Sequence, residues 1–176
     1  MNESVFGFEK DVIFMNEALK KAHEAYELGE VPVGAIVVDE FGKIIGDGYN
    51  LVERTFFQGA HAEVRAIAKA GQQRMDWRFD ECWLYVTLEP CLMCAGCILL
   101  SRFKGIVYGA SSPQMGALYT VLISSVYNKN NFLVVKGIQE DRAKNLLKDF
   151  FHMQRISKEE THEKYANSER DTHKHP

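Results

Sequence analysis

The sequence has few cysteines and no excess of positive charge. Its four cysteines are spread over 176 residues, with three of them between positions 91 and 97. They are too few and too clustered for the disulfide framework of a small secreted protein. They favour a reducing compartment, and we expect a cytoplasmic protein. The net charge of −3 excludes a strongly basic surface, so any contact with a nucleic acid would depend on a local patch.

The chain also lacks long hydrophobic runs. No apolar stretch approaches the roughly 20 residues that cross a bilayer. The first nine residues contain acids and no long apolar segment. We therefore expect neither a membrane span nor a signal peptide. Apolar residues nevertheless make up 46% of the chain and charged residues 26%, as in ordinary globular proteins. This length and composition predict one domain with a sizeable core.

Hydrophobic periodicity predicts strands that alternate with helices. We predict helices at 11–28, 61–70, 90–101, 114–125 and 140–156. Short β-branched or aromatic runs predict strands at 31–38, 43–49, 82–87, 105–108 and 132–136. Because the first two strands form a hairpin and the others alternate with helices, we expect a three-layer α/β/α fold around a five-stranded mixed sheet. We place this domain at residues 1–156 and a polar, disordered tail at 157–176.

Two short motifs together form a set of metal ligands. His61 and Glu63 form a His-x-Glu motif, and Cys91 and Cys94 form a Cys-x-x-Cys motif directly after a proline. One imidazole and two thiolates leave a tetrahedral zinc ion with an open position, which a water molecule can occupy. Glu63 remains as a carboxylate that can move the protons of this water. The motifs therefore predict a zinc site that deaminates a nucleobase by hydrolysis.

A further cysteine leaves other metal sites open. Cys97 extends the motif to Cys-x-x-Cys-x-x-Cys, which suits a structural zinc with four protein ligands or an iron–sulfur cluster. A third interpretation needs no metal, because cysteines near a helix start are often buried as small hydrophobic residues. Neither a structural zinc nor a cluster needs Glu63, so the carboxylate favours the catalytic zinc.

The two motifs resemble the zinc-dependent nucleobase deaminase superfamily. The segments around them resemble its tRNA-specific adenosine deaminase (TadA) family. The segments that carry this resemblance are Glu30–Ala35, Gly48–Asn50, Ala60–Glu63, Thr87–Gly96, Ser101–Arg102, Val107–Ala110 and Phe150–Arg155. The resemblance implies a cytidine-deaminase-like fold, a homodimer, and conversion of adenosine to inosine at the wobble position of a tRNA anticodon, in bacteria that of an arginine tRNA.

The resemblance also implies how the metal site works. His61, Cys91 and Cys94 would hold one zinc ion per subunit, which activates a water molecule near neutral pH. Glu63 would pass a proton from this water to N1 of adenine as C6 is attacked. It would then help to protonate the departing amine.

Other residues are implied as substrate contacts. Asn50 would hydrogen-bond the base, and the backbone at Ala60 would approach it. Val31 and Pro32 would form part of the pocket wall. For Asn50 the alternative is a turn residue at the end of a strand, because asparagine is common in turns.

A single-stranded anticodon loop suits such a pocket, because its bases can be splayed out of the stack. Lys148 and Arg155, on the last predicted helix, are the expected RNA contacts. The alternative is an ordinary solvated face, since acidic residues lie between the basic ones.

The sequence departs from the family pattern in two places. After Gly109-Ala110, most relatives have an acidic residue and a lysine, and neither is present in Ser111–Gly116. Phe56 and Phe57 are also unusual and would either stack on a base or fill a subunit interface. The departures keep open a deaminase of a free base or nucleotide, such as guanine, cytosine or deoxycytidylate. A zinc-stabilised RNA-binding module without catalysis is the alternative from another class.

Overall fold

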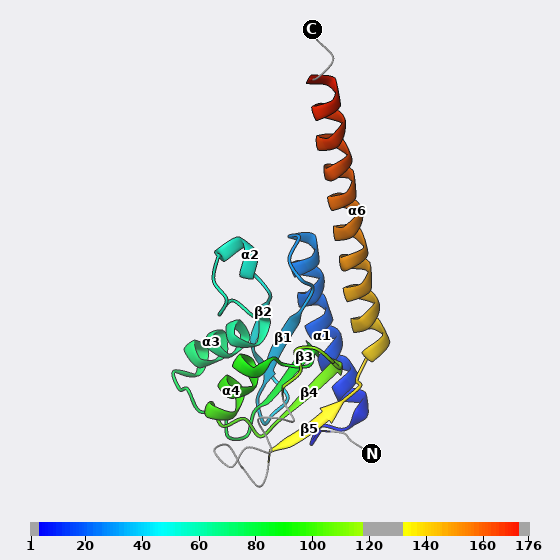
Figure 1. The fold of residues 1–176 in the computed structure, drawn as a ribbon. Coiled ribbons are helices and arrows are strands. Elements are labelled where there is room, and N and C mark those ends of the chain that lie inside the picture. Colours follow the sequence, from blue (N-terminus) through cyan, green and yellow to red (C-terminus); the bar gives the residue numbers. More distant parts are fainter. Residues whose placement is uncertain (1–3, 118–131, 173–176) are drawn as a thin grey trace.

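The computed structural model describes residues 4–117 and 132–172, and for residue 158 and residues 160–172 it describes the backbone alone. The helices and strands follow one another in an α/β order (Figure 1). Their bounds are α1 Phe8–Glu27, β1 Gly34–Val38, β2 Ile44–Tyr49, α2 Val52–Thr55, α3 Ala62–Arg74, β3 Trp83–Leu88, α4 Leu92–Leu100, β4 Gly105–Ala110, β5 Leu133–Lys136 and α6 Glu140–Thr172.

The five strands form one mixed sheet in the order β2-β1-β3-β4-β5. Strand β1 pairs antiparallel with β2 and with β3, whereas β3, β4 and β5 run parallel. The opening hairpin places β2 at one edge, and the helical crossover after β3 makes its pairing with β4 parallel. The predicted five-stranded mixed sheet is thus confirmed.

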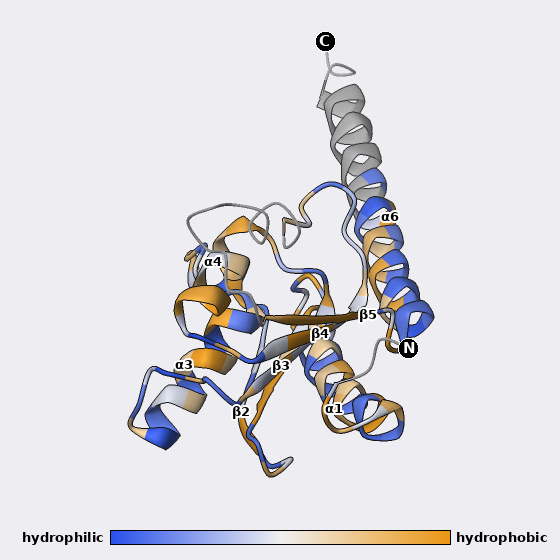
Figure 2. Ribbon diagram, turned by 90° about the horizontal axis from the view of Figure 1, so that it is seen from below, coloured by the Kyte–Doolittle hydropathy of each residue, from blue (hydrophilic) through white to orange (hydrophobic). Residues whose placement is uncertain are grey.

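Helices cover both faces of the sheet (Figures 1 and 2). Successive residues of a strand point to opposite faces, so Ala35 and Val37 pack with α3 and α4. Ile36 and Val38 pack with α1 and α6 on the other face. This arrangement buries two hydrophobic cores, one on each side, and confirms the three-layer α/β/α prediction.

Glycines in the edge strand allow α3 to lie very close to the sheet. A Cβ atom added at Gly48 would lie 2.5 Å from the backbone oxygen of Ala62. One added at Gly46 would lie 2.4 Å from the backbone oxygen of Ala66. Both distances are shorter than any van der Waals contact, so only glycine fits. This close packing fixes where α3 begins.

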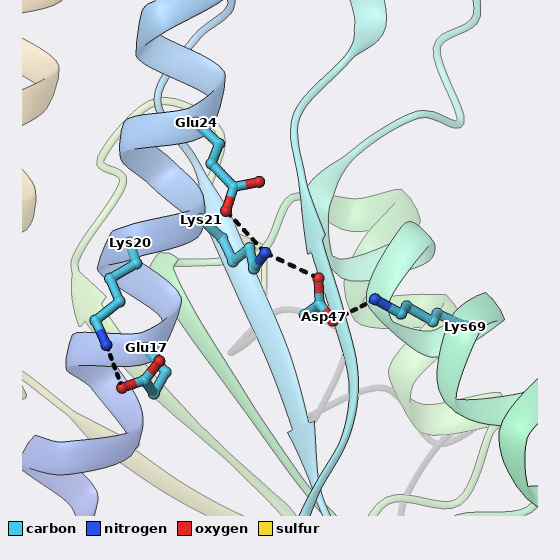
Figure 3. A network of polar contacts seen from close by, with 6 residues as sticks. All are labelled: Glu17, Lys20, Lys21, Glu24, Asp47 and Lys69. Atoms are coloured by element: carbon cyan, nitrogen blue, oxygen red, sulfur yellow. Dashed lines mark hydrogen bonds and ion pairs between the residues drawn. The ribbon is translucent and has the colours of Figure 1, made fainter.

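An ion-pair network joins the edge strand to a helix on each face (Figure 3). Asp47 of β2 lies 3.2 Å from Lys21 of α1 and 2.5 Å from Lys69 of α3. Lys21 also pairs with Glu24, at 2.8 Å. Burial raises the pKa of Asp47, but the hydrogen bonds from Lys69 and Lys21 outweigh it and hold this pKa below its usual value. A charged side chain on an edge strand also discourages pairing with another chain.

The predicted element bounds are wrong in several places. The helix predicted at 61–70 continues to Arg74, and its C-cap residue Met75 has a left-handed backbone with φ 56°. The segment between the strand predicted at 43–49 and this helix contains the short helix α2. Of the helix predicted at 114–125, residues 114–117 contain a turn and no helix, and the rest lies outside the described residues.

The last helix is much longer than predicted. We expected it to end at 156, whereas α6 has 33 residues and continues to Thr172. The structure describes residues 157–172 as part of this helix, and the segment is rich in lysine, glutamate and other residues with adequate helix propensity. The division into a domain at 1–156 and a tail stays a prediction.

Among the described residues, no helix is both long and apolar enough to cross a membrane.

The close packing at Gly48 gives a stability prediction. We expect Gly48→Ala to lower the free energy of unfolding by about 1–3 kcal/mol, because the methyl group must push α3 away from β2. The matched control is Gly71→Ala in α3, where the nearest atom to the new Cβ lies at 3.4 Å and alanine should be neutral or stabilising by about 0.5–1 kcal/mol. Urea unfolding of both variants measures the difference, and equal effects would contradict the packing argument.

Candidate active site

The three predicted metal ligands lie at the beginnings of two helices. His61 is the N-cap residue of α3 and Cys91 is the N-cap residue of α4, and both have extended backbones. Cys94 follows in the first turn of α4. Neither N-cap side chain forms a capping hydrogen bond with its helix. Both side chains are therefore free to point toward one common position.

The distances between the three side chains fit a tetrahedral zinc ion. His61 Nδ1 lies 3.6 Å from Cys91 Sγ and 3.4 Å from Cys94 Sγ. All three ligand atoms lie within 4.8 Å of one another. Usual Zn–N and Zn–S bond lengths place nitrogen and sulfur ligands about 3.5 Å apart across a tetrahedron. The cluster therefore has the spacing that zinc requires.

The fourth ligand needed by a structural zinc or a cluster is not present in the described part of the chain. The metal-ligand group there contains His61, Cys91 and Cys94 only. Cys97 packs against the hydrophobic core between the sheet and the α3–α4 layer. This arrangement favours the three-ligand site with an open position over both four-ligand alternatives.

The electrostatics of the two thiols also favour a cation. Hydrogen bonds from Cys94 and His61 lower the pKa of the Cys91 thiol to about 3. The hydrogen bond with Cys91, together with burial, raises the pKa of Cys94. The pKa values of the two thiols are thus shifted in opposite directions. Zinc would stabilise both thiolates and release a proton.

Glu63 lies close to the cluster but is not part of it. It is the second residue of α3, its side chain is 4% exposed, and burial raises the pKa of its carboxyl group. A spacing of two residues does not place side chains on one helix face. Because His61 precedes the helix with φ −66° and ψ 151°, both side chains nevertheless reach the same cavity.

A cavity of about 310 Å³ opens beside these residues. This volume is at the lower end for ligand pockets and suits a single base. The residues that line it are Val31, Val33, Asn50, Val52, Glu53, Gln58, His61, Ala62, Glu63, Leu88, Glu89, Cys91, Ser112 and Met115. The structure thus brings the predicted contacts Val31 and Asn50 to the cavity. Pro32 and Ala60 are not among the lining residues.

The segment that departs from the family pattern forms part of the cavity wall. Ser112 and Met115 both line the cavity, and the Ser112 backbone N–H donates to Glu89 Oε2 at 3.0 Å. Gln58 lies 3.4 Å from His61, between the Nε2 atoms of the two side chains. Sequence reasoning missed Gln58 and Met115 as lining residues, since no motif marks a loop residue that folding brings to a pocket.

The remaining predicted residues lie outside the cavity. Lys148 and Arg155 are exposed on α6, which packs against the end of α1 through the rings of Phe150 and Tyr26 at 5.9 Å. Phe56 is 95% exposed and has a left-handed backbone with φ 52°. These residues are accessible on the surface, but the structure contains no partner for them.

Comparisons with known proteins agree with this geometry. The model of the cytidine and deoxycytidylate deaminase zinc-binding region matches residues 8–110. The tRNA-specific adenosine deaminase of Bacillus subtilis (strain 168) is 40% identical over 152 residues, which are 85% of this chain and 93% of that protein. The chain belongs to the tRNA-specific adenosine deaminase family. The predicted fold, the zinc cofactor and the enzymatic nature of the protein are thereby confirmed, and the non-catalytic RNA-binding module is excluded.

Solved structures also resemble this deaminase. One comes from biochemical and structural studies of A-to-I editing by tRNA:A34 deaminases. It has a TM-score of 0.73 and 33% identity, and the match covers 77% of this chain and 99% of that one. A guanine deaminase from Bacillus subtilis has a TM-score of 0.55 and 33% identity, with 64% and 76% of the two chains covered. The roles of individual site residues stay predictions.

The ligand set gives a prediction about metal content. We expect Cys94→Ser to reduce zinc to well below one ion per chain, because a hydroxyl group is a much weaker zinc ligand than a thiolate. Cys97→Ala is the matched control in the same helix and should retain the metal and the activity. Elemental analysis of the purified variants measures zinc. Loss of zinc from the Cys97 variant would mean that the metal site includes this residue.

Proposed function

We propose that this deaminase converts the wobble adenosine of a tRNA anticodon to inosine, and that the tRNA is an arginine tRNA. The observation that carries this proposal is the 40% identity to a tRNA-specific adenosine deaminase along 93% of its length. The small cavity supports it, because a base splayed from the anticodon loop can enter while the rest of the loop stays outside. We also place the protein in the cytoplasm, because its few, clustered cysteines favour a reducing compartment.

The chemistry needs a nucleophilic water and a group that moves protons. His61, Cys91 and Cys94 would hold a zinc ion, which would supply Lewis-acid activation of a water molecule near neutral pH. Glu63 would accept a proton from this water and deliver it to N1 of adenine as the oxygen adds to C6. Glu63 would then take the second proton from the added hydroxyl group and pass it to the amino group, which would leave as ammonia as C6 becomes a carbonyl. Its burial and raised pKa suit a residue that must both accept and donate protons.

The base is held by the residues around the cavity. We assign Asn50 as its hydrogen-bond partner and Val31 as an apolar wall. Pro32 as a wall residue and Ala60 as a backbone contact stay proposals, although neither residue lines the cavity. Ala60 donates its N–H to the Phe57 carbonyl oxygen and accepts the N–H of Leu51, so its backbone holds the loop in front of the metal site.

Lys148 and Arg155 are the proposed contacts with the RNA outside the cavity. Both are exposed, and α6 extends past the sheet on the side where α2 lies (Figure 1). Positive side chains on this helix would neutralise phosphates of the stem.

A second candidate is a deaminase that acts on a free base such as guanine. The cavity volume of about 310 Å³ suits a base without its ribose as well as one in a loop. The likeness to a guanine deaminase, at 33% identity, also favours it. Both candidate functions use the same metal site. They differ in whether the rest of an RNA substrate is bound outside the cavity.

The decisive experiment uses an arginine tRNA anticodon stem-loop with adenosine at the wobble position. We expect the zinc-loaded protein to form inosine, measured by nucleoside mass spectrometry after digestion. The same stem-loop with guanosine at this position is the substrate control. Glu63→Ala should lower kcat by about 10²–10⁴-fold, the usual contribution of a general acid–base residue, while zinc content stays near one ion per chain.

Two results would contradict this proposal. Turnover of free guanine without any inosine in the stem-loop would assign the protein to the second candidate. Loss of zinc from Glu63→Ala would mean that the carboxylate is a metal ligand and not the proton carrier.

We also propose that the protein is a homodimer. Leu92 and Leu100 lie on one stripe of α4 and are 64% and 62% exposed. Gly96 lies between them, and a Cβ atom added there would meet nothing within 4 Å. An apolar stripe of this kind on a short helix favours contact with another protein surface. We propose that this surface is a second copy of the chain. Because Cys91 and Cys94 lie at the start of α4, a partner bound along this helix would lie beside the metal site and help to shape it.

This proposal predicts the effect of a charge in the stripe. We expect Leu100→Glu to convert a dimer to a monomer, because burying an unpaired carboxylate in an apolar interface is strongly unfavourable. Phe41→Glu is the control, since Phe41 is an exposed apolar residue of the β1–β2 turn. Light scattering coupled to gel filtration measures the mass. A mass unaffected by Leu100→Glu would place any dimer interface elsewhere.

A further inference from the structure

Glu30 is a buried acid that the chemistry described above does not use. It follows Gly29, which has φ 76° and lies just beyond the end of α1. The Glu30 N–H donates to the Ala25 carbonyl oxygen at 3.0 Å, so its backbone is fixed to that helix. Its side chain is only 1% exposed. Within residues 4–117 and 132–172, no ion pair is formed with this carboxylate. A buried acid of this kind needs hydrogen-bond donors.

The donors come from the segment that forms one wall of the cavity. Glu30 Oε2 accepts hydrogen bonds from Asn50 Nδ2 at 3.1 Å and from the Glu53 N–H at 3.2 Å. Glu30 Oε1 accepts one from the Arg54 N–H at 2.7 Å. Asn50 and Glu53 both line the cavity. The Glu30 carboxylate thus connects the end of α1, through hydrogen bonds, to Asn50, the proposed base-binding residue, and to helix α2.

The carboxylate also determines how the Asn50 amide is oriented. An ionised carboxylate can only accept hydrogen bonds, so the amide nitrogen, and not the amide oxygen, must face it. The Asn50 backbone is held separately, because its N–H donates to the Val33 carbonyl oxygen at 3.0 Å. With backbone and side chain both fixed, Asn50 presents its second amide hydrogen and its oxygen in one arrangement.

We propose that Glu30 is a positioning residue for base recognition, which acts by fixing the amide of Asn50. The proposal rests on the proposed function only in that Asn50 contacts the base undergoing deamination. Glu30 does not touch the substrate or the metal. Its contribution is to hold the amide in the binding geometry before the base arrives, so that binding does not require reorganisation.

The test is a double-variant cycle on the zinc-loaded full chain. We expect Glu30→Gln to lower kcat/KM by about 100-fold, the size of effect that misplacing a binding group by about 1 Å can have. Zinc content should stay near one ion per chain. Glu27→Gln removes the same charge from an exposed position of α1 and should leave kcat/KM unchanged.

The cycle separates positioning from general structural support. If Glu30 acts through Asn50, the double variant Glu30→Gln/Asn50→Ala should be no slower than Asn50→Ala alone, since residues that act as a unit are not additive. A double variant that loses the product of the two single effects would overturn the proposal. So would a Glu30→Gln variant with the kcat/KM of the parent protein. If Glu30→Gln does not fold, Glu30→Asp, which keeps the charge, goes through the same cycle.

Failure of the proposed function can be told apart from failure of this inference. The cycle is measured with whichever substrate the parent protein deaminates, the anticodon stem-loop or free guanine. Non-additivity with guanine would support the positioning role of Glu30 even though the RNA substrate had been ruled out. Additivity with either substrate would overturn the role of Glu30 and leave the substrate assignment intact.

Discussion

The active site depends on how closely α3 packs against the edge strand β2. Gly46 and Gly48 remove the side chains that would otherwise separate the strand from the backbone of α3. His61 is the N-cap residue of this helix, so its position follows from the packing. Cys91 is placed in the same way at the start of α4, directly after β3. The metal ligands are therefore held by the sheet and two helix termini, and little conformational entropy remains to be lost when a metal binds.

This rigid arrangement concentrates groups that prefer to be neutral when buried. Burial raises the pKa of Glu63 and a hydrogen bond with Cys91 raises that of Cys94, whereas hydrogen bonds lower the pKa of Cys91. A divalent cation would favour the ionised form of all three groups, so zinc affinity and the stability of this region are expected to be coupled. The buried carboxylate of Glu30 has no metal beside it, and three N–H groups donate hydrogen bonds to it.

The parts of the protein that could be predicted from sequence are those set by local pattern. The spacing of Cys91 and Cys94 places both sulfurs at one helix start by local geometry, and β-branched runs indicate the buried strands. That His61 meets them depends on the packing of α3. The helix predicted at 61–70 continues through Gly71, since a glycine inside a helix costs only about 1 kcal/mol and packing of the α3 face outweighs it. Gln58 and Met115 belong to loops whose path depends on the completed fold. The hydrogen bonds of Glu30 join residues 20 or more positions apart, which no local pattern encodes.

The residues proposed for catalysis lie at helix termini, whereas much of the cavity wall that would select the substrate lies in loops. The metal ligands and Glu63 lie at helix termini packed against the sheet, where a change of sequence would disturb the fold. The cavity wall is completed by the 50–58 segment and by the turn that contains Ser112 and Met115, and loops of this kind can change without moving the ligands. The Ser111–Gly116 departure from the family pattern falls in the second group. It can alter which base, or which nucleotide beside it, is accepted, while the zinc site keeps the geometry for hydrolytic deamination. We therefore expect substrate choice to depend on the cavity wall, where Glu30 holds the side chain of Asn50 in place.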